Sequence, residues 1–460
     1  RRGRAEARPT LTLALLTIEY TDAEPDTYTL PLAITQARRS DEKIETLIAR
    51  LKDGCMLYEP VHDDTFAQAL LDAMGRRPSR TFKELRGTGH LDAQVIRAEQ
   101  SNTAIVYGQR LFLKLFRRIE PGENVDLEIS RFLNEETDFR NTPRLAGAIE
   151  YRTDHSEPMT LAMAQSFTPN SGDAWTYTLD AIGRYFERIT SDTGAAEKVK
   201  AHTADPDFAR DVFGPYLDNA ELLGRRTAEM HLALASRDDI PAFAPEPFTP
   251  HYQRSIYQSI RTQIVQTLAL LRRRAKENLD AQELLKHEAE LQQRIRTLLT
   301  NKIGGLRIRT HGDYHLGQVL YTGNDFVIID FEGEPARPLS ERRIKRSALR
   351  DVAGMLRSFH YAPYAVFFGR TAGGIIRAED AALLENGAVF WHQWISSAFL
   401  RAYLDRSAGA RHLPSSRDEV SVLLNAYLLE KALYEVAYEL NNRPEWVRIP
   451  LRGVLDLLRG

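Results

Sequence analysis

The sequence is poor in cysteine and has no excess of either charge. Cys55 is the only cysteine among 460 residues, which excludes an internal disulfide, and no Cys/His zinc-finger spacing is present. The 61 Lys and Arg residues nearly balance the 63 Asp and Glu residues, so no overall field attracts nucleic acid or an anionic membrane. We therefore expect a protein stabilised by packing in a reducing compartment, the cytoplasm, with no nucleic-acid partner.

Long apolar runs and a targeting signal are also missing. The longest apolar segments, such as 11–18, have the length of a strand and fall short of the roughly 20 residues that a membrane helix needs. No signal-peptide layout is present either, so we expect no membrane association. The sequence starts at Arg1 and enters a β-like run almost at once, which leads us to expect a piece of a longer polypeptide.

Two common phosphate-binding motifs are absent. The sequence contains no G-x-x-x-x-G-K-[ST], which excludes a Walker-type loop, and no G-x-G-x-x-G flap. The loop 99–102 stands where such a flap would offer backbone N–H groups. Phosphate chemistry in this chain must therefore depend on other residues.

The chain begins with strand patterns. The segments 11–20 and 27–34 flank a polar turn, and 103–107 and 110–116 flank Gly108, so both pairs are predicted to form hairpins. The alternation in the second hairpin puts Lys114 on one face with two phenylalanines.

Helical patterns follow from about Trp175. Apolar residues recur every three or four positions over 256–271 and again over 284–298, as expected for two amphipathic helices joined as a hairpin. The Lys- and Arg-rich segment 272–278 is predicted to be a solvated connector between them.

Two acidic clusters stand at the ends of short predicted strands. The strand 306–310 runs into a glycine-bearing loop with Asp313 and Gln318, and the apolar strand 326–329 ends at Asp330, followed by Glu332. Carboxylate and amide oxygens suit Mg²⁺, which leaves its other positions to water and phosphate. The spacing from Asp313 to Gln318 and the following Asp330 match the order of a kinase catalytic loop and its metal-binding aspartate.

An upstream pair completes this pattern. Lys114 lies on a predicted strand and Glu128 on the helical stretch 125–133, in the order of the lysine and glutamate that grip ATP phosphates in kinases. Glu123 and Asp126 share the segment and are alternative partners. We predict that Asp313 is the catalytic base, that Lys114 and Glu128 bind the cofactor, and that Gln318, Asp330 and Glu332 bind the metal.

Longer strings around these residues resemble the aminoglycoside-phosphotransferase-like kinases and, within them, the maltokinases. The resemblance rests on the following strings: HGDYHLGQVL at 311–320, DFEGEP at 330–335, LRDVAGMLRSF at 349–359, LGRRTAEMHLA at 223–233, EKALYE at 430–435 and RPEW at 443–446. It covers most of the chain from about Arg110 onward. Gln318 in place of the kinase Asn, and Glu332 in place of the Gly of D-F-G, depart from the general kinase pattern.

The resemblance implies an α+β, bilobal, protein-kinase-like fold. It implies a β-rich N-terminal cap subdomain over 1–95, a kinase N-lobe over 96–168, and a largely helical C-lobe over 169–460 that carries the catalytic loop. The implied activity is the ATP- and Mg²⁺-dependent phosphorylation of maltose to maltose 1-phosphate, which feeds trehalose and α-glucan metabolism. The same domain also occurs fused behind a trehalose synthase, so such a domain is an expected partner, although a free-standing enzyme fits the sequence equally.

Further residues receive roles from their position or from the resemblance. Met163 and Gln165 stand where a hinge would present backbone to adenine, with an ordinary connection as the alternative. His311 is expected to brace the catalytic loop and Asp351 to hold its backbone. The maltose site is expected to include Lys431, Tyr434 and Trp446, while a surface lysine and a core tyrosine remain the plain alternative for the first two.

Three other functions compete with this prediction. His311, Asp313 and His315 alternate like ligands of a transition metal, which would make the protein a metallohydrolase. A kinase of the same fold that acts on another small hydroxyl acceptor is the second alternative. The third is an inactive kinase fold that serves a fused partner domain.

Overall fold

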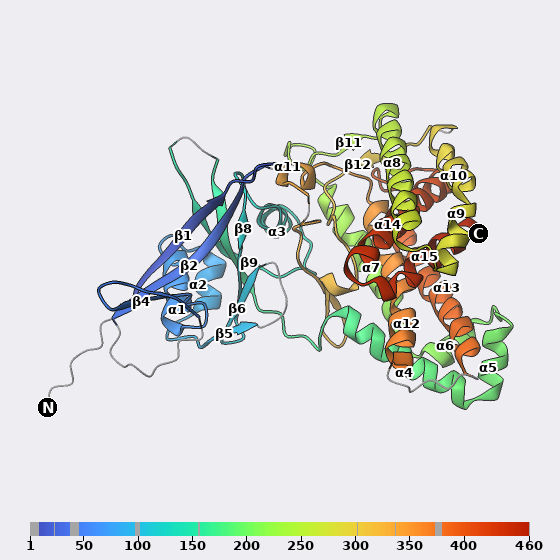
Figure 1. The fold of residues 1–460 in the computed structure, drawn as a ribbon, viewed down its shortest axis with the longest axis horizontal. Coiled ribbons are helices and arrows are strands. Elements are labelled where there is room, and N and C mark those ends of the chain that lie inside the picture. Colours follow the sequence, from blue (N-terminus) through green and yellow to red (C-terminus); the bar gives the residue numbers. More distant parts are fainter. Residues whose placement is uncertain are drawn as a thin grey trace. The chain divides into compact units, whose positions relative to one another are not determined.

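The computed structural model describes residues 9–22, 24–36, 46–96, 102–154, 157–300, 302–335, 337–372 and 380–459. Most of the loop 99–102 lies outside these ranges. The described chain forms two compact units. The N-terminal unit comprises the residues up to Glu136 together with Thr142–Pro169, and the C-terminal unit comprises Thr137–Asn141 and the residues from Asn170 onward. Figure 1 shows strands in the former and mostly helices in the latter.

In its described residues, the N-terminal unit consists of antiparallel strands and three helices. Its elements are β1 (Thr10–Ile18), β2 (Asp26–Gln36), β3 (Leu47–Arg50), β4 (Cys55–Tyr58), α1 (Asp64–Met74), α2 (Arg80–Arg86), β5 (Ala93–Ile96), β6 (Thr103–Tyr107), β7 (Leu111–Leu115), β8 (Arg118–Ile119), α3 (Val125–Glu135), β9 (Leu145–Tyr151) and β10 (Met159–Ser166). Both predicted hairpins, β1–β2 and β6–β7, are confirmed.

The strands form two antiparallel sheets. One has the order β1-β2-β4-β3 with β8 paired to β2, and the other has the order β5-β6-β7-β10-β9. The turn between β6 and β7 has positive φ at both Gly108 (51°) and Gln109 (52°), and it joins Tyr107 to its partner Leu111 through three residues. On its other side β7 pairs with β10, where Lys114 lies directly opposite Met163.

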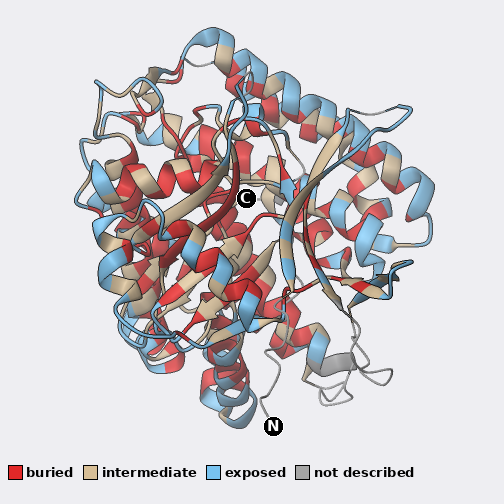
Figure 2. Ribbon diagram, turned by 90° about the vertical axis from the view of Figure 1, so that its left-hand side faces the viewer, coloured by how far each residue is buried: buried red, intermediate tan, exposed pale blue. Residues whose placement is uncertain are grey.

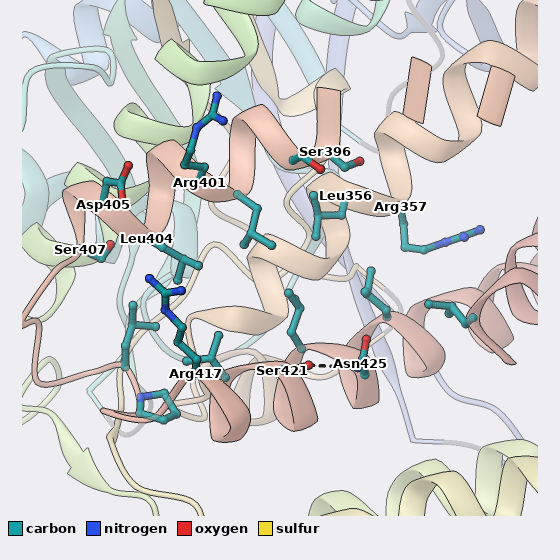
Figure 3. Close-up of a pocket in the computed structure, with 18 of the residues that line it drawn as sticks. Leu356, Arg357, Ser396, Arg401, Leu404, Asp405, Ser407, Arg417, Ser421 and Asn425 are labelled. Carbon is teal, nitrogen blue, oxygen red and sulfur yellow. Dashed lines mark hydrogen bonds between the residues drawn. The ribbon is translucent and has the colours of Figure 1, made fainter. Parts of the chain in front are cut away.

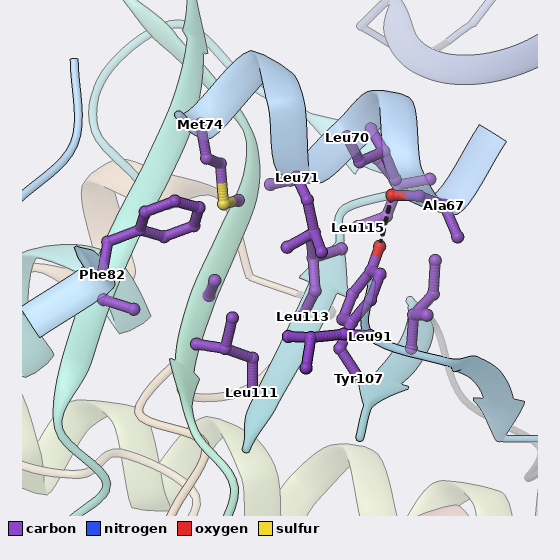
Figure 4. Packing of buried hydrophobic residues seen from close by; sticks show 14 of the residues in the cluster. Ala67, Leu70, Leu71, Met74, Phe82, Leu91, Tyr107, Leu111, Leu113 and Leu115 are labelled. Atoms are coloured by element: carbon purple, nitrogen blue, oxygen red, sulfur yellow. Dashed lines mark hydrogen bonds between the residues drawn. The ribbon is translucent and has the colours of Figure 1, made fainter. Parts of the chain in front are cut away.

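The helices α1 and α2 pack on the second sheet. Leu70, Leu71 and Phe82 share one buried cluster with Leu111 and Leu113, as Figure 4 shows. The Tyr107 hydroxyl donates a hydrogen bond of 2.9 Å to the carbonyl oxygen of Ala67 in the same cluster. Residues of the predicted cap and of the predicted N-lobe therefore share one core, and the boundary at 95/96 stays a prediction.

The C-terminal unit is mostly helical. Its elements are α4 (Ala174–Ser191), α5 (Thr193–Lys200), α6 (Pro206–Phe213), α7 (Pro215–Leu234), β11 (Glu246–Pro247), α8 (Pro250–Arg274), α9 (Leu279–Lys286), α10 (Glu288–Thr300), β12 (Leu306–Arg307), η1 (Leu316–Gln318), β13 (Val319–Tyr321), β14 (Phe326–Ile328), α11 (Leu339–Arg342), α12 (Leu349–Ala372), α13 (Ala381–Arg406), α14 (Arg417–Asn442), η2 (Pro444–Trp446) and α15 (Arg448–Arg459).

Two predictions about this unit need correction. The helix expected over 284–298 is divided at His287 into α9 and α10. The strand expected over 306–310 ends at Arg307, because Ile308 pairs with Arg346 in an isolated bridge instead of extending β12. The second change matters for the site, since it fixes the start of the loop that carries Asp313.

Close helix packing gives this unit its core. A Cβ atom at Gly224 on α7 would lie 2.3 Å from the carbonyl oxygen of Phe399 on α13, so only glycine allows these two helices to approach so closely. Trp391 and Phe399 of α13 are fully buried, and Figure 2 shows helices with buried residues on one side and exposed residues on the other. Among the described helices, none has the length and apolar character needed to cross a membrane.

Candidate active site

The loop that carries Asp313 is held by a buried carboxylate. Asp351 in the first turn of α12 accepts hydrogen bonds from the backbone N–H groups of His311 (2.7 Å) and Gly312 (3.0 Å). His231 Nε2 lies 3.1 Å from the same carboxylate. Burial alone would raise the pKa of Asp351, but the hydrogen bond and charge of His231, together with these loop contacts, hold its pKa below the usual value. This is the backbone contact expected of Asp351.

Other contacts fix the loop against its surroundings. The ring of His311 donates through Nε2 to the carbonyl oxygen of Ile329 at 2.9 Å, and Tyr314 OH lies 2.9 Å from the Thr227 hydroxyl. A Cβ atom at Gly354 would lie 2.5 Å from the carbonyl oxygen of Tyr314, so α12 passes directly against the loop. His311 thus braces the loop end, the role predicted for it.

Asp313 forms an ion pair at the open side of this loop. Its Oδ1 atom lies 3.1 Å from Nζ of Lys431 on α14, and its Oδ2 atom lies 3.9 Å from Nε2 of His315. Burial raises the pKa of Asp313, but the positive charge of Lys431 outweighs it and the pKa lies below the usual 3.8. Asp313 is therefore ionised at neutral pH, in the form in which a carboxylate accepts a proton.

His315 does not compete for this role. Burial lowers its pKa below 6.5, so the ring is neutral at pH 7, and its Nδ1 atom accepts a hydrogen bond from the backbone N–H of Gly317 at 3.1 Å. The alternation of His311, Asp313 and His315 therefore reflects loop contacts, because both imidazoles are engaged with backbone groups.

The second acidic cluster lies directly after β14. Asp330 has a left-handed backbone with φ of 65°, a conformation that non-glycine residues adopt only when the surrounding structure enforces it. Phe331 is fully buried with its ring 5.0 Å from that of His311. Asp330 and Glu332 each offer a carboxylate oxygen, and these two atoms lie within 4.8 Å of each other. Two carboxylates at this spacing suit a divalent cation with hard oxygen ligands.

Gln318 connects the two clusters through its backbone. Its carbonyl oxygen accepts a hydrogen bond of 3.0 Å from the N–H of Ile329, next to Asp330. A Cβ atom at Gly312 would lie 3.1 Å from the Cα atom of Gly333, so the loops that carry Asp313 and Asp330 pack together. The prediction that the two strand ends lie close in space agrees with this packing.

A pocket of about 730 Å³ opens beside Asp313. Its walls come from the loop of Asp313, the segment after β14, and the helices α8, α12 and α14. The lining includes Gln258, Ser259, Thr262, Gln263, Gln266, Arg273, Asp313, Glu334, Arg337, Arg350, Tyr427, Glu430, Lys431 and Tyr434. The structure thus brings together Asp313, Lys431 and Tyr434, the latter with its ring 5.2 Å from the Lys431 ammonium.

Trp446 does not line the pocket beside Asp313. It lies in η2, stacked at 6.1 Å on Tyr361 and beneath the guanidinium of Arg443, and it is not among the described residues that line the pocket. Trp446 thus packs at the end of α14, and its expected contact with the acceptor stays a prediction.

Two carboxylates in the pocket are neutralised by arginines. Arg350 lies 3.1 Å from Glu334 and 3.6 Å from Glu430, and Arg337 also pairs with Glu334. Burial raises the pKa of Glu334, but Arg350 and Arg337 hold it below its usual value. Glu334, Glu430 and Asp313 thus each face a lysine or an arginine.

In the N-terminal unit, Lys114 pairs with Asp126. Its Nζ atom lies 2.7 Å from Oδ2 of Asp126, which is almost fully buried, whereas the sequence predicted Glu128 as the partner. Asp126 follows the Asn124 cap in the first turn of α3 and was one of the two alternatives on this segment. Glu128 lies two positions further along the same helix, and its role at the cofactor stays a prediction.

Met163 and Gln165 lie inside a sheet. Both belong to β10, which has β7 on one side and β9 on the other up to Gln165. Their backbone groups therefore belong to strand ladders, and the chain leaves the sheet only after Ser166. Gln165 is buried and donates to Ser130, which in turn lies 3.4 Å from Asp126, so it supports the Lys114 pair instead of forming a hinge.

Sequence reasoning gave no role to several pocket residues. Arg350, Glu334 and Glu430 stand within the strings that carried the family resemblance, so their charges could have been noticed there. Gln258, Thr262 and Gln266 recur every four positions beside the apolar stripe of the same helix, a pattern that resembles an ordinary solvated face.

The C-terminal unit contains a second and larger cavity of about 1860 Å³. Figure 3 shows it between α13 and α14, with Arg401 and Asp405 on α13 and Arg417 and Asn425 on α14. None of the predicted site residues lines it within the described chain. Both cavities have walls from α12 and α14, but the predicted site residues among their lining belong to the smaller one.

Comparisons with known proteins agree with this arrangement. A model of the phosphotransferase enzyme family matches residues 207–337, which include Asp313 and Asp330. Glucosamine kinase of Mycolicibacterium smegmatis is 25% identical over 403 residues, covering 86% of this chain and 88% of the relative. Glucosamine kinase of Streptacidiphilus jiangxiensis is 25% identical over 413 residues, covering 86% and 81%.

A solved structure shares the fold along the whole chain. Glucosamine kinase in complex with glucosamine, ADP and inorganic phosphate superimposes with a TM-score of 0.65 at 21% identity, covering 99% of this chain and 95% of that chain. Together with the family match, this likeness supports a kinase of the phosphotransferase type. The chain has the protein-kinase-like fold of phosphotransferase enzymes, with a β-sheet N-terminal region and a helical C-terminal region.

Proposed function

We propose that this chain transfers the γ-phosphate of ATP to a hydroxyl group of a sugar, with Asp313 as the catalytic base. The observation that carries this proposal is the ionised Asp313 at the wall of a polar pocket, 3.1 Å from Lys431. Asp351 holds the loop beneath it through two backbone hydrogen bonds, so the carboxylate is fixed before the acceptor arrives.

The reaction follows from these positions. The acceptor hydroxyl gives its proton to Asp313 while its oxygen forms a bond to the γ-phosphorus and the bond to the β-phosphate oxygen of ADP breaks. Asp330, Glu332 and Gln318 would hold Mg²⁺, which neutralises phosphate charge when bound. Lys114, held by Asp126, would bind phosphate oxygens of ATP.

For the acceptor we propose maltose, phosphorylated to maltose 1-phosphate in trehalose and α-glucan metabolism, with a trehalose synthase domain as a partner. A neutral sugar fits the pocket because Glu334, Glu430 and Asp313 each face Arg350 or Lys431. The ammonium group of an amino sugar would be repelled by these cations, because each of the three carboxylates is already paired. Neutral hydroxyl groups are not repelled.

Glucosamine is the second candidate acceptor. It is favoured by the names of the two relatives and of the solved structure. A third possibility, another small hydroxyl acceptor, follows from the fold alone.

One experiment separates the candidates. Steady-state kinetics with ATP and Mg²⁺ against maltose, glucose and glucosamine, with product identification by NMR, should give the highest kcat/KM for maltose and a phosphate on its anomeric oxygen. A higher kcat/KM for glucosamine would reject maltose and leave the kinase assignment standing. No turnover of any sugar would reject the sugar-kinase assignment itself.

A further inference from the structure

Three polar side chains form a stripe along α8 on the wall of the pocket. Gln258, Thr262 and Gln266 follow one another at intervals of four residues, all are exposed, and all line the same pocket as Asp313. In the part of the chain that the structure describes, none of the three makes a side-chain hydrogen bond. Their amide and hydroxyl groups are therefore available to a ligand.

The neighbouring polar residues of α8 behave differently. Gln263 donates to the carbonyl oxygen of Glu430 at 3.0 Å, and Thr267 donates to that of Leu433 at 3.4 Å. Both acceptors are on α14, the helix of Lys431 and Tyr434. The two bonds fix α8 against α14, so the stripe has a set position relative to the Asp313–Lys431 pair.

The stripe is longer than one sugar ring. From Gln258 to Gln266 the helix rises ~12 Å at 1.5 Å per residue, a little over two turns. One helical turn of ~5.4 Å is comparable to the length of one pyranose ring. A single ring at Asp313 would leave most of these groups without a partner, whereas a chain of two or more rings along α8 would meet them in succession.

The chemistry of the stripe suits neutral hydroxyl groups. An amide both donates and accepts hydrogen bonds, and so does the threonine hydroxyl, which matches the mixed character of sugar hydroxyls. The three side chains carry no charge and so offer no preference for phosphate or ammonium groups.

We propose that Gln258, Thr262 and Gln266 form a subsite for the sugar rings remote from the phosphorylated hydroxyl, so that they select neutral saccharides of two or more rings over monosaccharides. The inference rests on the proposed sugar-kinase activity. It adds that α8 selects acceptors by their number of sugar rings. In this scheme Asp313 performs the transfer and the stripe discriminates among acceptors.

The test compares acceptors of one, two and three rings. The variant Gln258→Ala/Thr262→Ala/Gln266→Ala should raise KM for maltose and maltotriose about tenfold or more, while the kinetics with glucose and the KM for ATP stay unchanged. Arg261→Ala serves as a matched control, because Arg261 is exposed on α8 and does not line the pocket. Thermal unfolding of each variant checks that the helix is intact.

Each outcome decides the matter. Equal losses for glucose and maltose, or no change for maltose, would overturn the subsite. If the unaltered protein phosphorylates none of the three sugars, the proposed function fails. Calorimetric titration with maltotriose then decides the subsite alone: binding that the triple variant loses would support it, and absence of binding would reject it.

Discussion

The two cavities of the C-terminal unit differ in where the charged residues of their walls find their ion-pair partners. In the larger one, three of the lining arginines are bound by acids outside the lining: Arg357 by Glu435, Arg401 by Glu221 and Arg411 by Asp238. In the smaller one, Asp313 and Lys431 face each other on the pocket wall itself. Volume alone would select the larger cavity, whereas paired charges that a ligand can reach favour the smaller one, where we propose the chemistry takes place.

The imidazoles show the same contrast. His360 and His392 line the larger cavity, and burial lowers the pKa of each far below 6.5, so both rings are neutral at pH 7. Buried neutral rings of this kind are common packing residues. The smaller cavity instead has the Asp313 carboxylate, whose pKa the charge of Lys431 lowers against burial.

The largest expected effect is on kcat, and one matched pair of substitutions, one in each cavity, tests it. Asp313→Asn should lower kcat by ~10²-fold or more, because it removes a base without changing shape, while nucleotide binding remains. Asp405→Asn, on the exposed carboxylate of the larger cavity, should leave kcat unchanged. Comparable losses in both variants, measured by steady-state kinetics, would remove the distinction between the cavities.

The next largest effect concerns the cluster after β14. Asp330→Ala should abolish the Mg²⁺ dependence of ATP binding, because its carboxylate is the main protein ligand proposed for the cation. Calorimetric titration with ATP over a series of Mg²⁺ concentrations measures this directly. A nucleotide affinity that still rises with Mg²⁺ would contradict the metal role of Asp330.

A smaller effect is expected where the loop is anchored. Asp351→Ala should destabilise the protein by ~1–3 kcal/mol for each donor left without a partner, here the loop N–H groups and His231. Because the pKa of Asp351 is lowered in the folded protein, its stabilisation is present above its usual pKa of 3.8 and is lost as pH falls through its folded pKa. Urea unfolding at pH 7 checks the first claim; a loss no larger than that of Asp405→Ala would contradict it.

The smallest effect is a shift of the pH profile. Lys431 lowers the pKa of Asp313 against burial, which raises it, so Lys431→Met should raise that pKa. The acid limb of kcat/KM should then move to higher pH, with activity lost at pH values where the unaltered protein still works. An acid limb that stays in place or moves to lower pH would show that Lys431 does not set the protonation of Asp313.

The sequence predicts much of the local structure because turns and periodicities are local. Gly108 and the alternation around Lys114 specify one hairpin, and the loop of Asp313 follows from its glycines and short flanking strands. The break at His287 between α9 and α10 was not predicted, since the apolar residues on both sides keep a helical spacing.

The site residues that were missed depend on tertiary contacts. Asp126 and Glu128 are both acidic and close in sequence, and only the folded structure shows that Asp126 lies 2.7 Å from Lys114. Trp446 was assigned to the acceptor from its string, but its ring stacks on Tyr361, a residue 85 positions earlier. The α8 stripe has the composition of a solvated face, and only the neighbouring α14 turns it into a wall.

The close approach of α12 to the Asp313 loop at Gly354 has a consequence for how this protein can evolve. Any side chain there would strike the carbonyl oxygen of Tyr314, and Asp351 binds the same loop one helical turn earlier, so the transfer machinery tolerates few substitutions. The exposed residues Gln258, Thr262 and Gln266 lie on a separate segment, α8, and do not take part in the contacts of Gly354 and Asp351 with the Asp313 loop. With the roles proposed above, acceptor preference can change through substitutions on α8 while the transfer step is kept, which would allow one ancestral kinase to yield enzymes for different sugars.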